Sequence, residues 1–232
     1  MKIDIQLFGV HQRDEMIANL AEKLRLDTSQ IHYDDRPNGG HCFYTAKKAW
    51  LAPLAEGVTH RLVCSDDIEV CNNFLEIAEQ IAEAHPKSVT SFFPFEFMER
   101  NPEIEQCETP YFLCHIVSGC AIMMPVEYIE GYCNYADNNF GENADDDRTL
   151  QTWAEKSRIQ ILTTIPSLIQ HIGDVSILNP TCKTRRTVYF EQNPEANWQS
   201  KKIANWYEKE WFFANHGVPY KNKGVLKYVE EY

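Results

Sequence analysis

The sequence lacks any apolar run that approaches the roughly 20 residues of a membrane-spanning helix. It also lacks internal repeats and tracts rich in Gly/Ser, Gln/Asn or Pro, which argues against a disordered arm. No signal-peptide pattern precedes the first apolar residues, and we therefore expect a cytoplasmic protein without membrane insertion. The 232 residues, 44% of them hydrophobic and 12% aromatic, are enough for one compact domain.

Several motifs of common enzyme classes are also missing. Neither GxxxxGK[ST] nor GxGxxG occurs, which argues against P-loop and Rossmann cofactor chemistry. The absence of a GxSxG elbow disfavours a serine hydrolase. The eight cysteines include no CxxC pair, and we expect them to be reduced and structural.

Basic side chains are scarce, with 22 Lys and Arg against 34 Asp and Glu. The resulting net charge of −12 excludes a protein that coats nucleic acid generally. Residues 182–232 are the one net basic region, and their interleaved aromatics allow a nucleic-acid interpretation. A helix over about 195–214, docked through an aromatic stripe, is the stronger interpretation. We therefore expect one domain with a C-terminal helical extension.

The first half of the chain alternates between strand and helix patterns. Ile3, Ile5 and Leu7 alternate with polar residues, and a helical spacing follows over 16–24. Further pairs follow, with strands at 30–33, 61–64 and 88–93, a turn at 37–40, and helices up to residue 50 and over 72–84. Three strand-helix units predict a mostly parallel, doubly wound, Rossmann-like α/β sheet with helices on both faces. Ligands of such sheets bind at the carboxyl ends of the strands.

The second half has a different order. Residues 112–124 predict a long strand or a strand pair, interrupted at Ser118-Gly119. We expect a polar loop over 133–147, a helix over about 147–160 and a short strand over 161–165. The segment 171–174 is expected to be a loop.

Polar residues stand directly after the predicted strands. His11, Asp35 and the pair Asp66-Asp67 would therefore converge on one cleft. Adjacent carboxylates repel each other unless a cation or a hydrogen-bond network compensates them. Mg²⁺ or Mn²⁺ could do so, because both prefer oxygen ligands and bridge to phosphates. A helix N-cap followed by first-turn acids is the alternative.

Two later segments could also carry chemistry. The contiguous carboxylates Asp145, Asp146 and Asp147 raise one another's proton affinity, which suits a general base, although a helix start favours acidic residues in any case. His171 stands beside Gly173, and a neutral imidazole is a competent Mn²⁺ ligand, although a lone histidine is more often structural.

The order of these segments resembles the GT-A glycosyltransferases. The stretch 59–68 is similar to the strand that ends in the family's acidic metal motif, but it has SDDI in place of DxD. Residues 145–150 with Trp153 resemble the ED-x-x-L segment that holds the general base, and 170–176 resembles a late loop with a metal-binding histidine. Other matches are Gly40 with the helix 44–50 and the strand with glycine at 116–121. The resemblance covers about residues 1–178 and implies a nucleotide-sugar-binding and catalytic domain over 1–178, with the C-terminal helical extension over 179–232.

The resemblance implies a metal-dependent, inverting transfer of a sugar from a nucleotide-diphosphate donor, with UDP favoured, to a hydroxyl group. Asp67 and His171 would bind Mn²⁺ or Mg²⁺, and Asp147, with Asp146 beside it, would be the base. The remaining binding residues implied are His11, Arg13, Asp35, Lys47, Asp66 and Gly119. The acceptor stays open and includes a hydroxylated base in phage DNA. The alternatives are a nucleotidyltransferase, whose usual glycine-rich loop is missing at 11–14, and an inactive nucleotide-binding module.

Overall fold

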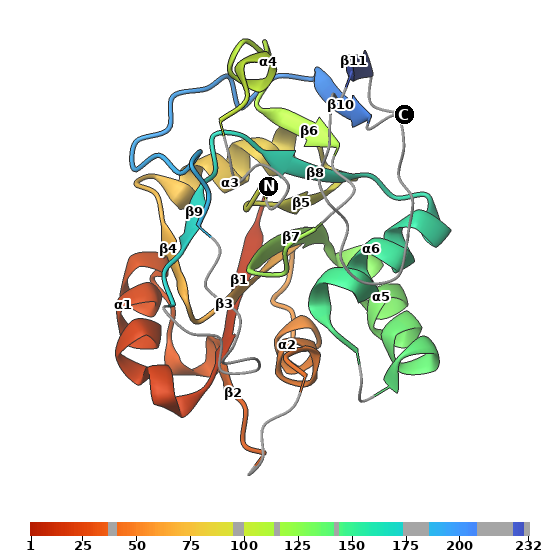
Figure 1. Ribbon diagram of the computed structural model, residues 1–232. Coiled ribbons are helices and arrows are strands. Elements are labelled where there is room, and N and C mark those ends of the chain that lie inside the picture. The colour runs from red at the N-terminus through yellow and green to blue at the C-terminus, as the bar shows by residue number, and fades with distance from the viewer. Residues whose placement is uncertain are drawn as a thin grey trace.

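The computed structural model describes residues 1–36, 41–94, 100–113, 117–141, 144–173, 186–207 and 225–229 (Figure 1). Its helices are α1 (Asp14–Leu24), α2 (Phe43–Trp50), α3 (Phe74–Ala84), α4 (Pro102–Glu105), α5 (Val126–Asn139) and α6 (Asp146–Ser157). Its strands are β1 (Ile3–Gly9), β2 (Ile31–Tyr33), β3 (His60–Ser65), β4 (Ile68–Val70), β5 (Val89–Ser91), β6 (Tyr111–Leu113), β7 (Ala121–Pro125), β8 (Ile161–Thr164), β9 (Ile169–His171), β10 (Ile203–Tyr207) and β11 (Val225–Val229).

The described strands form a large mixed sheet in the order β11-β10-β6-β8-β5-β7-β3-β1-β2, beside a small sheet of β4 and β9. The α/β class is confirmed, but the prediction of a mostly parallel sheet is wrong. β1 pairs parallel with β2 and β3, whereas β7 lies antiparallel between β3 and β5. The apolar run 112–124 divides into two strands, β6 and β7, which are not neighbours in the sheet. The sheet is mixed because β7 inserts antiparallel between β3 and β5.

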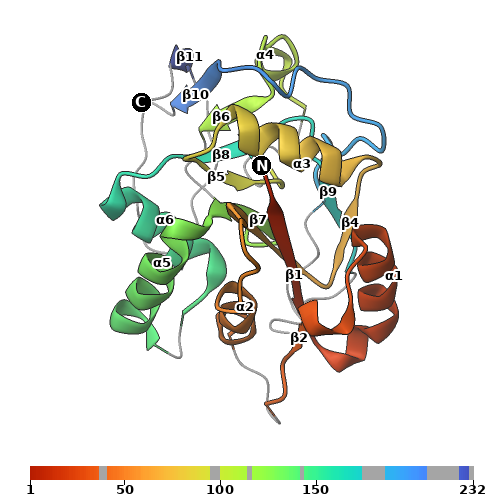
Figure 2. The ribbon, with the colours of Figure 1, turned by 180° about the vertical axis from the view of Figure 1, so that it is seen from behind.

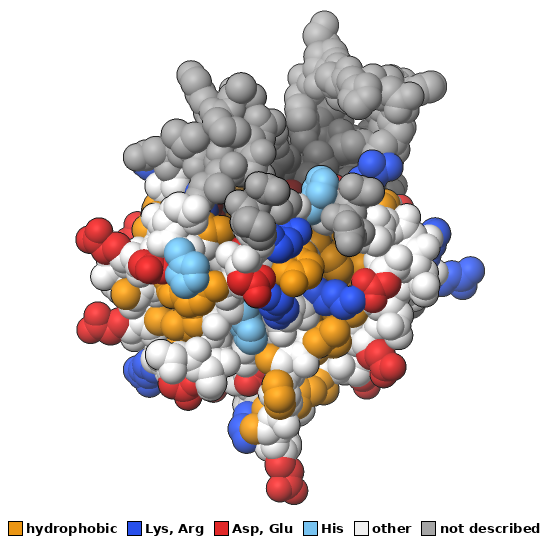
Figure 3. Space-filling view, turned by 90° about the horizontal axis from the view of Figure 1, so that it is seen from below, with side chains coloured by type: hydrophobic (Ala, Val, Ile, Leu, Met, Phe, Trp, Pro, Cys, Tyr) orange, Lys and Arg blue, Asp and Glu red, His pale blue; other side chains and the backbone are white. Residues whose placement is uncertain are grey.

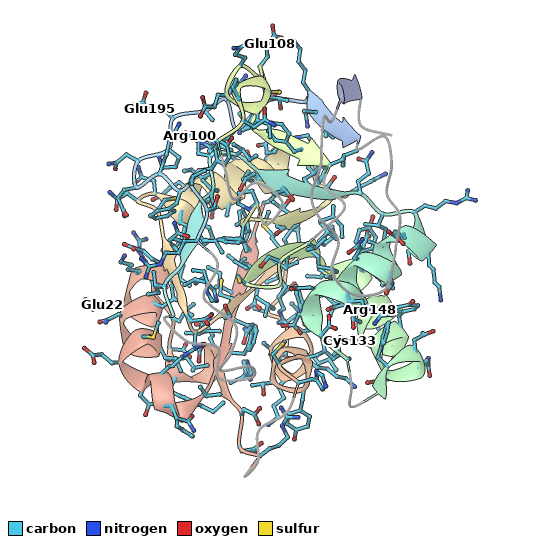
Figure 4. All side chains as sticks on the ribbon, in the orientation of Figure 1. Glu22, Arg100, Glu108, Cys133, Arg148 and Glu195 are labelled. Carbon is cyan, nitrogen blue, oxygen red and sulfur yellow. The ribbon has the colours of Figure 1, made fainter. Side chains whose placement is uncertain are left out.

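Helices cover both faces of the sheet, as predicted (Figures 1 and 2). Successive residues of a strand point to opposite faces, and so Leu7 and Leu62 join α1 and α3 in one core cluster. Phe8 and Val63, one residue further along each strand, join α2, α5 and α6 in the other. The side chains fill the space between sheet and helices, with Cys133 buried, while Glu22 and Glu108 are exposed (Figure 4).

A fully buried arginine ties α2 to the centre of the sheet. Arg61 of β3 donates from Nε to Asp4 Oδ2 at 2.7 Å. Its Nη1 donates to the carbonyl groups of Trp50 and Ala52 at 2.6 and 2.7 Å, and its Nη2 donates to that of Pro53 at 3.2 Å. The guanidinium therefore satisfies carbonyl groups at the C-terminal end of α2, which the helix itself leaves without partners.

Helix α5 corrects one prediction. Residues 133–139 belong to this helix, and not to the polar loop expected over 133–147. Ile129, Tyr132, Cys133 and Ala136 are buried at the spacing of one helix face, while the rest of the helix is mainly polar. Because only this narrow stripe is buried, most residues of the segment are polar, and its composition is therefore similar to that of a loop.

The C-terminal segment also differs from the prediction. A helix over 195–214 is wrong where it is described, because β10 covers 203–207 and pairs with β6 and β11 in the main sheet. Ile203 and Ala204 are fully buried, and Trp198 packs against Tyr111 from a turn. Residues 208–214, the turn at 37–40 and the boundary near 178 lie outside the described residues.

Two general expectations can be compared with the described residues. Within them, no helix combines the length and apolarity needed to cross a bilayer. The free thiols described there include Cys42, Cys64, Cys71, Cys120 and Cys133. Cys114 and Cys182 lie outside this part of the chain.

Candidate functional site

The candidate site lies at the carboxyl ends of β1 and β3, where neighbouring parallel strands finish side by side. β7 runs in the opposite direction, so its first residue, Ala121, lies opposite Cys64 at this same end. Figure 3 looks onto this end of the molecule, where histidine, basic and acidic side chains gather near its middle.

The acidic pair after β3 is held by an arginine from the turn after β1. Arg13 Nη1 lies 2.7 Å from Asp66 Oδ1 and 2.6 Å from Asp67 Oδ2. The backbone N–H of Val10 donates to Asp66 Oδ2 at 2.9 Å. A Cβ on Gly9 would lie 2.5 Å from the Asp66 side chain, so the close approach of the strands requires glycine there. The compensation that adjacent carboxylates need is thus supplied by a guanidinium and a backbone amide.

Asp67 has further partners from β9 and β3. His171 Nε2 lies 3.0 Å from Asp67 Oδ2, and the Ser65 hydroxyl donates to Asp67 Oδ1 at 3.0 Å. The N–H of Ile172 donates to the Asp67 carbonyl oxygen at 2.8 Å. A Cβ on Gly173 would lie 3.1 Å from both Asp67 and Arg13. The ends of β1, β3 and β9 therefore meet at Asp67.

These contacts set the charge of the pair. Burial pushes the pKa of Asp67 upward, but the hydrogen bond and charge of His171, with the charge of Arg13, outweigh it and lower the pKa to about 2. Burial and the nearby Asp67 carboxylate raise the pKa of Asp66, an effect that Arg13 opposes. Asp67 is therefore the more readily ionised carboxyl group of the pair.

The second part of the site is the first turn of α6, where the three contiguous aspartates have different surroundings. Asp145 is the N-cap, and its side chain accepts the backbone N–H of Arg148 at 2.7 Å. Asp147 is exposed, and its carboxylate accepts the backbone N–H of Gly119. Asp146 is half-buried, with Oδ1 sealed from solvent and without a hydrogen-bond partner among the described residues.

Asp146 lines a small cavity between the sheet and α2, α5 and α6. The cavity measures about 10 Å³, close to the space of one water molecule. Burial, with the charge of Asp147, raises the pKa of Asp146 to about 7, and the hydrogen bond with the Cys42 thiol only partly offsets this. The cavity is otherwise mainly apolar, and its lining includes Phe8, Trp50, Val63, Tyr132 and Leu150.

The two parts of the site meet at the turn that precedes β7. The N–H of Ser65 donates to the Cys120 carbonyl at 2.8 Å, and the Ser65 hydroxyl donates to the same oxygen at 3.2 Å. The preceding residue, Gly119, contacts the start of α6, where a Cβ on it would lie 2.6 Å from Asp146 Cβ. The two-residue turn of Gly119 and Cys120 thus lies between the residues around Asp67 and the pair Asp146 and Asp147.

Most of the predicted site residues belong to two clusters. Arg13, Asp66, Asp67 and His171 form the Asp67 cluster, which is held together by ion pairs across the ends of three strands. Gly119, Asp146 and Asp147 form the second cluster, the Asp146-Asp147 cluster.

Three predicted binding residues make other contacts. His11 stacks on Tyr33, with ring centroids 4.1 Å apart and planes 8° apart. Asp35 is exposed and pairs with Lys48 at 3.1 Å. Lys47 pairs with Asp137 of α5 at 2.5 Å. The described contacts of these three side chains therefore lie away from the Asp67 cluster.

Three residues of the site were missed in the sequence analysis: Gly9, Ser65 and Cys42. The first two had a usable signal, because a glycine or a small hydroxyl residue stands near a predicted polar residue at a strand end. Cys42 had none, because its contact with Asp146 depends on the packing of α2 against α6.

Asp67 and His171 offer two adjacent atoms that a divalent cation could use only in place of the contact that now joins them. Among the described residues, no group of three or more His, Cys, Asp or Glu side chains could hold a metal ion. Two neighbouring ligands of an octahedral Mg²⁺, each about 2.1 Å from the ion, are about 3.0 Å apart. Asp67 Oδ2 and His171 Nε2 have this separation, 3.0 Å. Magnesium commonly takes one or two protein ligands and completes its shell with phosphates and water.

Comparison with known proteins gives no family. A scan against protein-family models finds no match to this chain, and a search of curated proteins finds none either.

Proposed function

We propose that this protein is a metal-dependent glycosyltransferase that moves a sugar from a nucleotide-diphosphate donor, with UDP favoured, to an acceptor hydroxyl. One observation carries the proposal: the Asp67 cluster and the Asp146-Asp147 cluster adjoin across the Gly119-Cys120 turn. The proposed site for the charged leaving group, at Asp67, and the proposed base, Asp147, are therefore neighbours at the carboxyl ends of β1 and β3.

The donor side of the site is the Asp67 cluster. Asp67 and His171 would hold the cation, which when bound stabilises the negative charge that develops on the departing diphosphate. Arg13 adds a guanidinium beside the same carboxylates, and guanidinium groups pair strongly with phosphate oxygens. Gly173 keeps the space beside Asp67 and Arg13 open, because a side chain at this position would be in tight contact with both residues.

The acceptor side is the start of α6, and the surroundings of the aspartates assign their roles. Asp147 is exposed and oriented by the Gly119 N–H, so it can reach an acceptor hydroxyl. Its carboxylate takes the hydroxyl proton while the oxygen forms a bond to the anomeric carbon, and the bond from that carbon to the diphosphate breaks. Attack from the face opposite the leaving group inverts the anomeric carbon. Asp146 supports this arrangement from the cavity side, and is a positioning residue for Gly119 and Asp147.

The test is a screen of nucleotide sugars with Mn²⁺ or Mg²⁺, with free sugar and nucleoside diphosphate measured by mass spectrometry. Slow donor hydrolysis is expected for one donor, because water replaces the unknown acceptor. Asp67→Asn should reduce this hydrolysis by about 100-fold or more, a loss typical of removing electrostatic stabilisation of a leaving group. Glu22→Gln, a change at an exposed residue of α1, is the matched control and should leave hydrolysis unchanged.

Four other outcomes would overturn the proposal in whole or in part. Release of pyrophosphate from a nucleoside triphosphate and a sugar phosphate would show nucleotidyl transfer. Absence of hydrolysis for every donor, together with absence of heat in calorimetric titrations with and without Mn²⁺, would show that the site does not use nucleotide sugars. Heat without hydrolysis would show a binding module in place of an enzyme. Hydrolysis that Asp67→Asn leaves unchanged would show that Asp67 does not hold the metal ion.

A further inference from the structure

Arg13 occupies the position between the two carboxylates where a cation is needed. It comes from the turn after β1, and its side chain is only 13% exposed. Nη1 contacts both Asp66 and Asp67, at 2.7 and 2.6 Å. Nη2 lies 3.1 Å from the point that a Cβ on Gly173 would occupy. The guanidinium is therefore enclosed by the ends of β3 and β9 and is not a solvated surface group.

The contacts of Asp67 leave little room for a second cation. Oδ2 is shared by Arg13 Nη1 and His171 Nε2, and Oδ1 accepts the Ser65 hydroxyl. A divalent ion that used Oδ2 and His171 would replace the contact between these two side chains. It would then share Oδ2 with the guanidinium, and the two cations would repel each other at short range.

A phosphate-bearing ligand removes this conflict. Arginine pairs with phosphate through two parallel hydrogen bonds, so a diphosphate beside the cluster offers the guanidinium an alternative partner. The negative charge of the diphosphate also compensates the divalent ion. The metal and the diphosphate therefore favour each other's binding through the position of Arg13.

We propose that Arg13 is the resident counter-ion of Asp66 and Asp67, and that it opposes binding of a divalent cation until a diphosphate ligand draws the guanidinium away from Asp67. The identity of this ligand rests on the proposed function. The role of Arg13 as counter-ion rests only on the contacts of the cluster.

The experiment is a titration of Mn²⁺ alone, followed by electron paramagnetic resonance of the free ion, in the absence of any nucleotide. Arg13→Met keeps the length of the side chain and removes its charge. We expect Mn²⁺ to bind Arg13→Met at least about tenfold more tightly than the wild type, since a competing positive charge is gone. Arg13→Lys retains a charge and should stay within about threefold of the wild type. Asp67→Asn in the Arg13→Met background should abolish the gain.

An unchanged or weaker Mn²⁺ affinity in Arg13→Met would overturn the proposal. If this variant unfolds without metal, its melting temperature with increasing Mn²⁺ replaces the titration, and a rise larger than that of the wild type is expected. A rise no larger than that of the wild type would count against the counter-ion role.

A second titration with UDP present tests the coupling. UDP should tighten Mn²⁺ binding to the wild type by about tenfold or more and should do so much less in Arg13→Met. Equal tightening in both proteins would overturn the coupling. If no nucleotide binds either protein while Arg13→Met still gains Mn²⁺ affinity, the proposed function fails and the counter-ion role stands.

Discussion

Asp146→Asn is expected to stabilise the protein at high pH and to have little effect at low pH. The pKa of Asp146 is raised by burial and by Asp147 to about 7, against an ordinary value of 3.8. The folded protein therefore keeps a proton that the unfolded chain loses between these two values. Because the folded state binds more protons in this window, the free energy of unfolding falls as the pH rises from about 4 to about 7.

The size of the effect follows from the same values. A rise from 3.8 to about 7, at about 1.4 kcal/mol per pH unit, sets a ceiling of about 4 kcal/mol. Asp146 is only half-buried as a residue, and solvent reduces the cost of its charge, so we expect about 2 kcal/mol. Asparagine has nearly the same shape but cannot ionise, and it therefore lacks this penalty at any pH.

The measurement is urea unfolding of both proteins at about pH 4.5 and about pH 8, followed by the fluorescence of the five tryptophans. The variant should exceed the wild type by about 2 kcal/mol more at the higher pH than at the lower one. Asp137→Asn is a control, because this carboxylate lies half-exposed on α5 and pairs with Lys47. If the difference between Asp146→Asn and the wild type is the same at both pH values, the carboxyl does not titrate in this window and the reasoning is refuted.

Two further substitutions test the fold around the site. Gly119→Ala places a Cβ 2.6 Å from that of Asp146 and should displace the start of α6. Sugar transfer should then fall by about tenfold or more, while donor hydrolysis persists. Equal loss of both activities would contradict the division of the site into a donor side and an acceptor side. Arg61→Met leaves Asp4 and three carbonyl groups without their partner and should lower the free energy of unfolding by about 3–5 kcal/mol in urea. A loss below about 1 kcal/mol would show that water replaces the guanidinium.

Local patterns were sufficient for the elements that carry the donor side. β1 alternates apolar with polar residues, β3 has a compact apolar run, and polar residues follow both strands, while α1 and α3 have a clear helical spacing. Since parallel neighbours finish at one edge, the meeting of Arg13 with Asp66 and Asp67 could be expected in outline. The sequence left open whether a metal ion or a hydrogen-bond network compensates the carboxylates, because Arg13 and Asp66 are 53 positions apart.

Longer-range pairings could not be predicted in this way. An apolar strand has the same pattern whether its neighbours run parallel or antiparallel, so the direction of β7 is not visible in residues 112–124. The C-terminal aromatic spacing suits a helix, but the pairing of β10 with β6 and β11 decides the structure there. In both segments tertiary contacts override the local pattern.

Under the proposed function, the reversed direction of β7 places the donor side and the acceptor side of the site on two different stretches of chain. Donor-side groups follow strands that arrive at the site, whereas Gly119 precedes a strand that leaves it. Changes confined to the turn before β7 and the first turn of α6 could therefore alter the choice of acceptor while β1, β3 and the cluster of Arg13, Asp66 and Asp67 stay as they are. Directed evolution towards a new acceptor has a compact target in this protein, at residues 117–120 and 145–147.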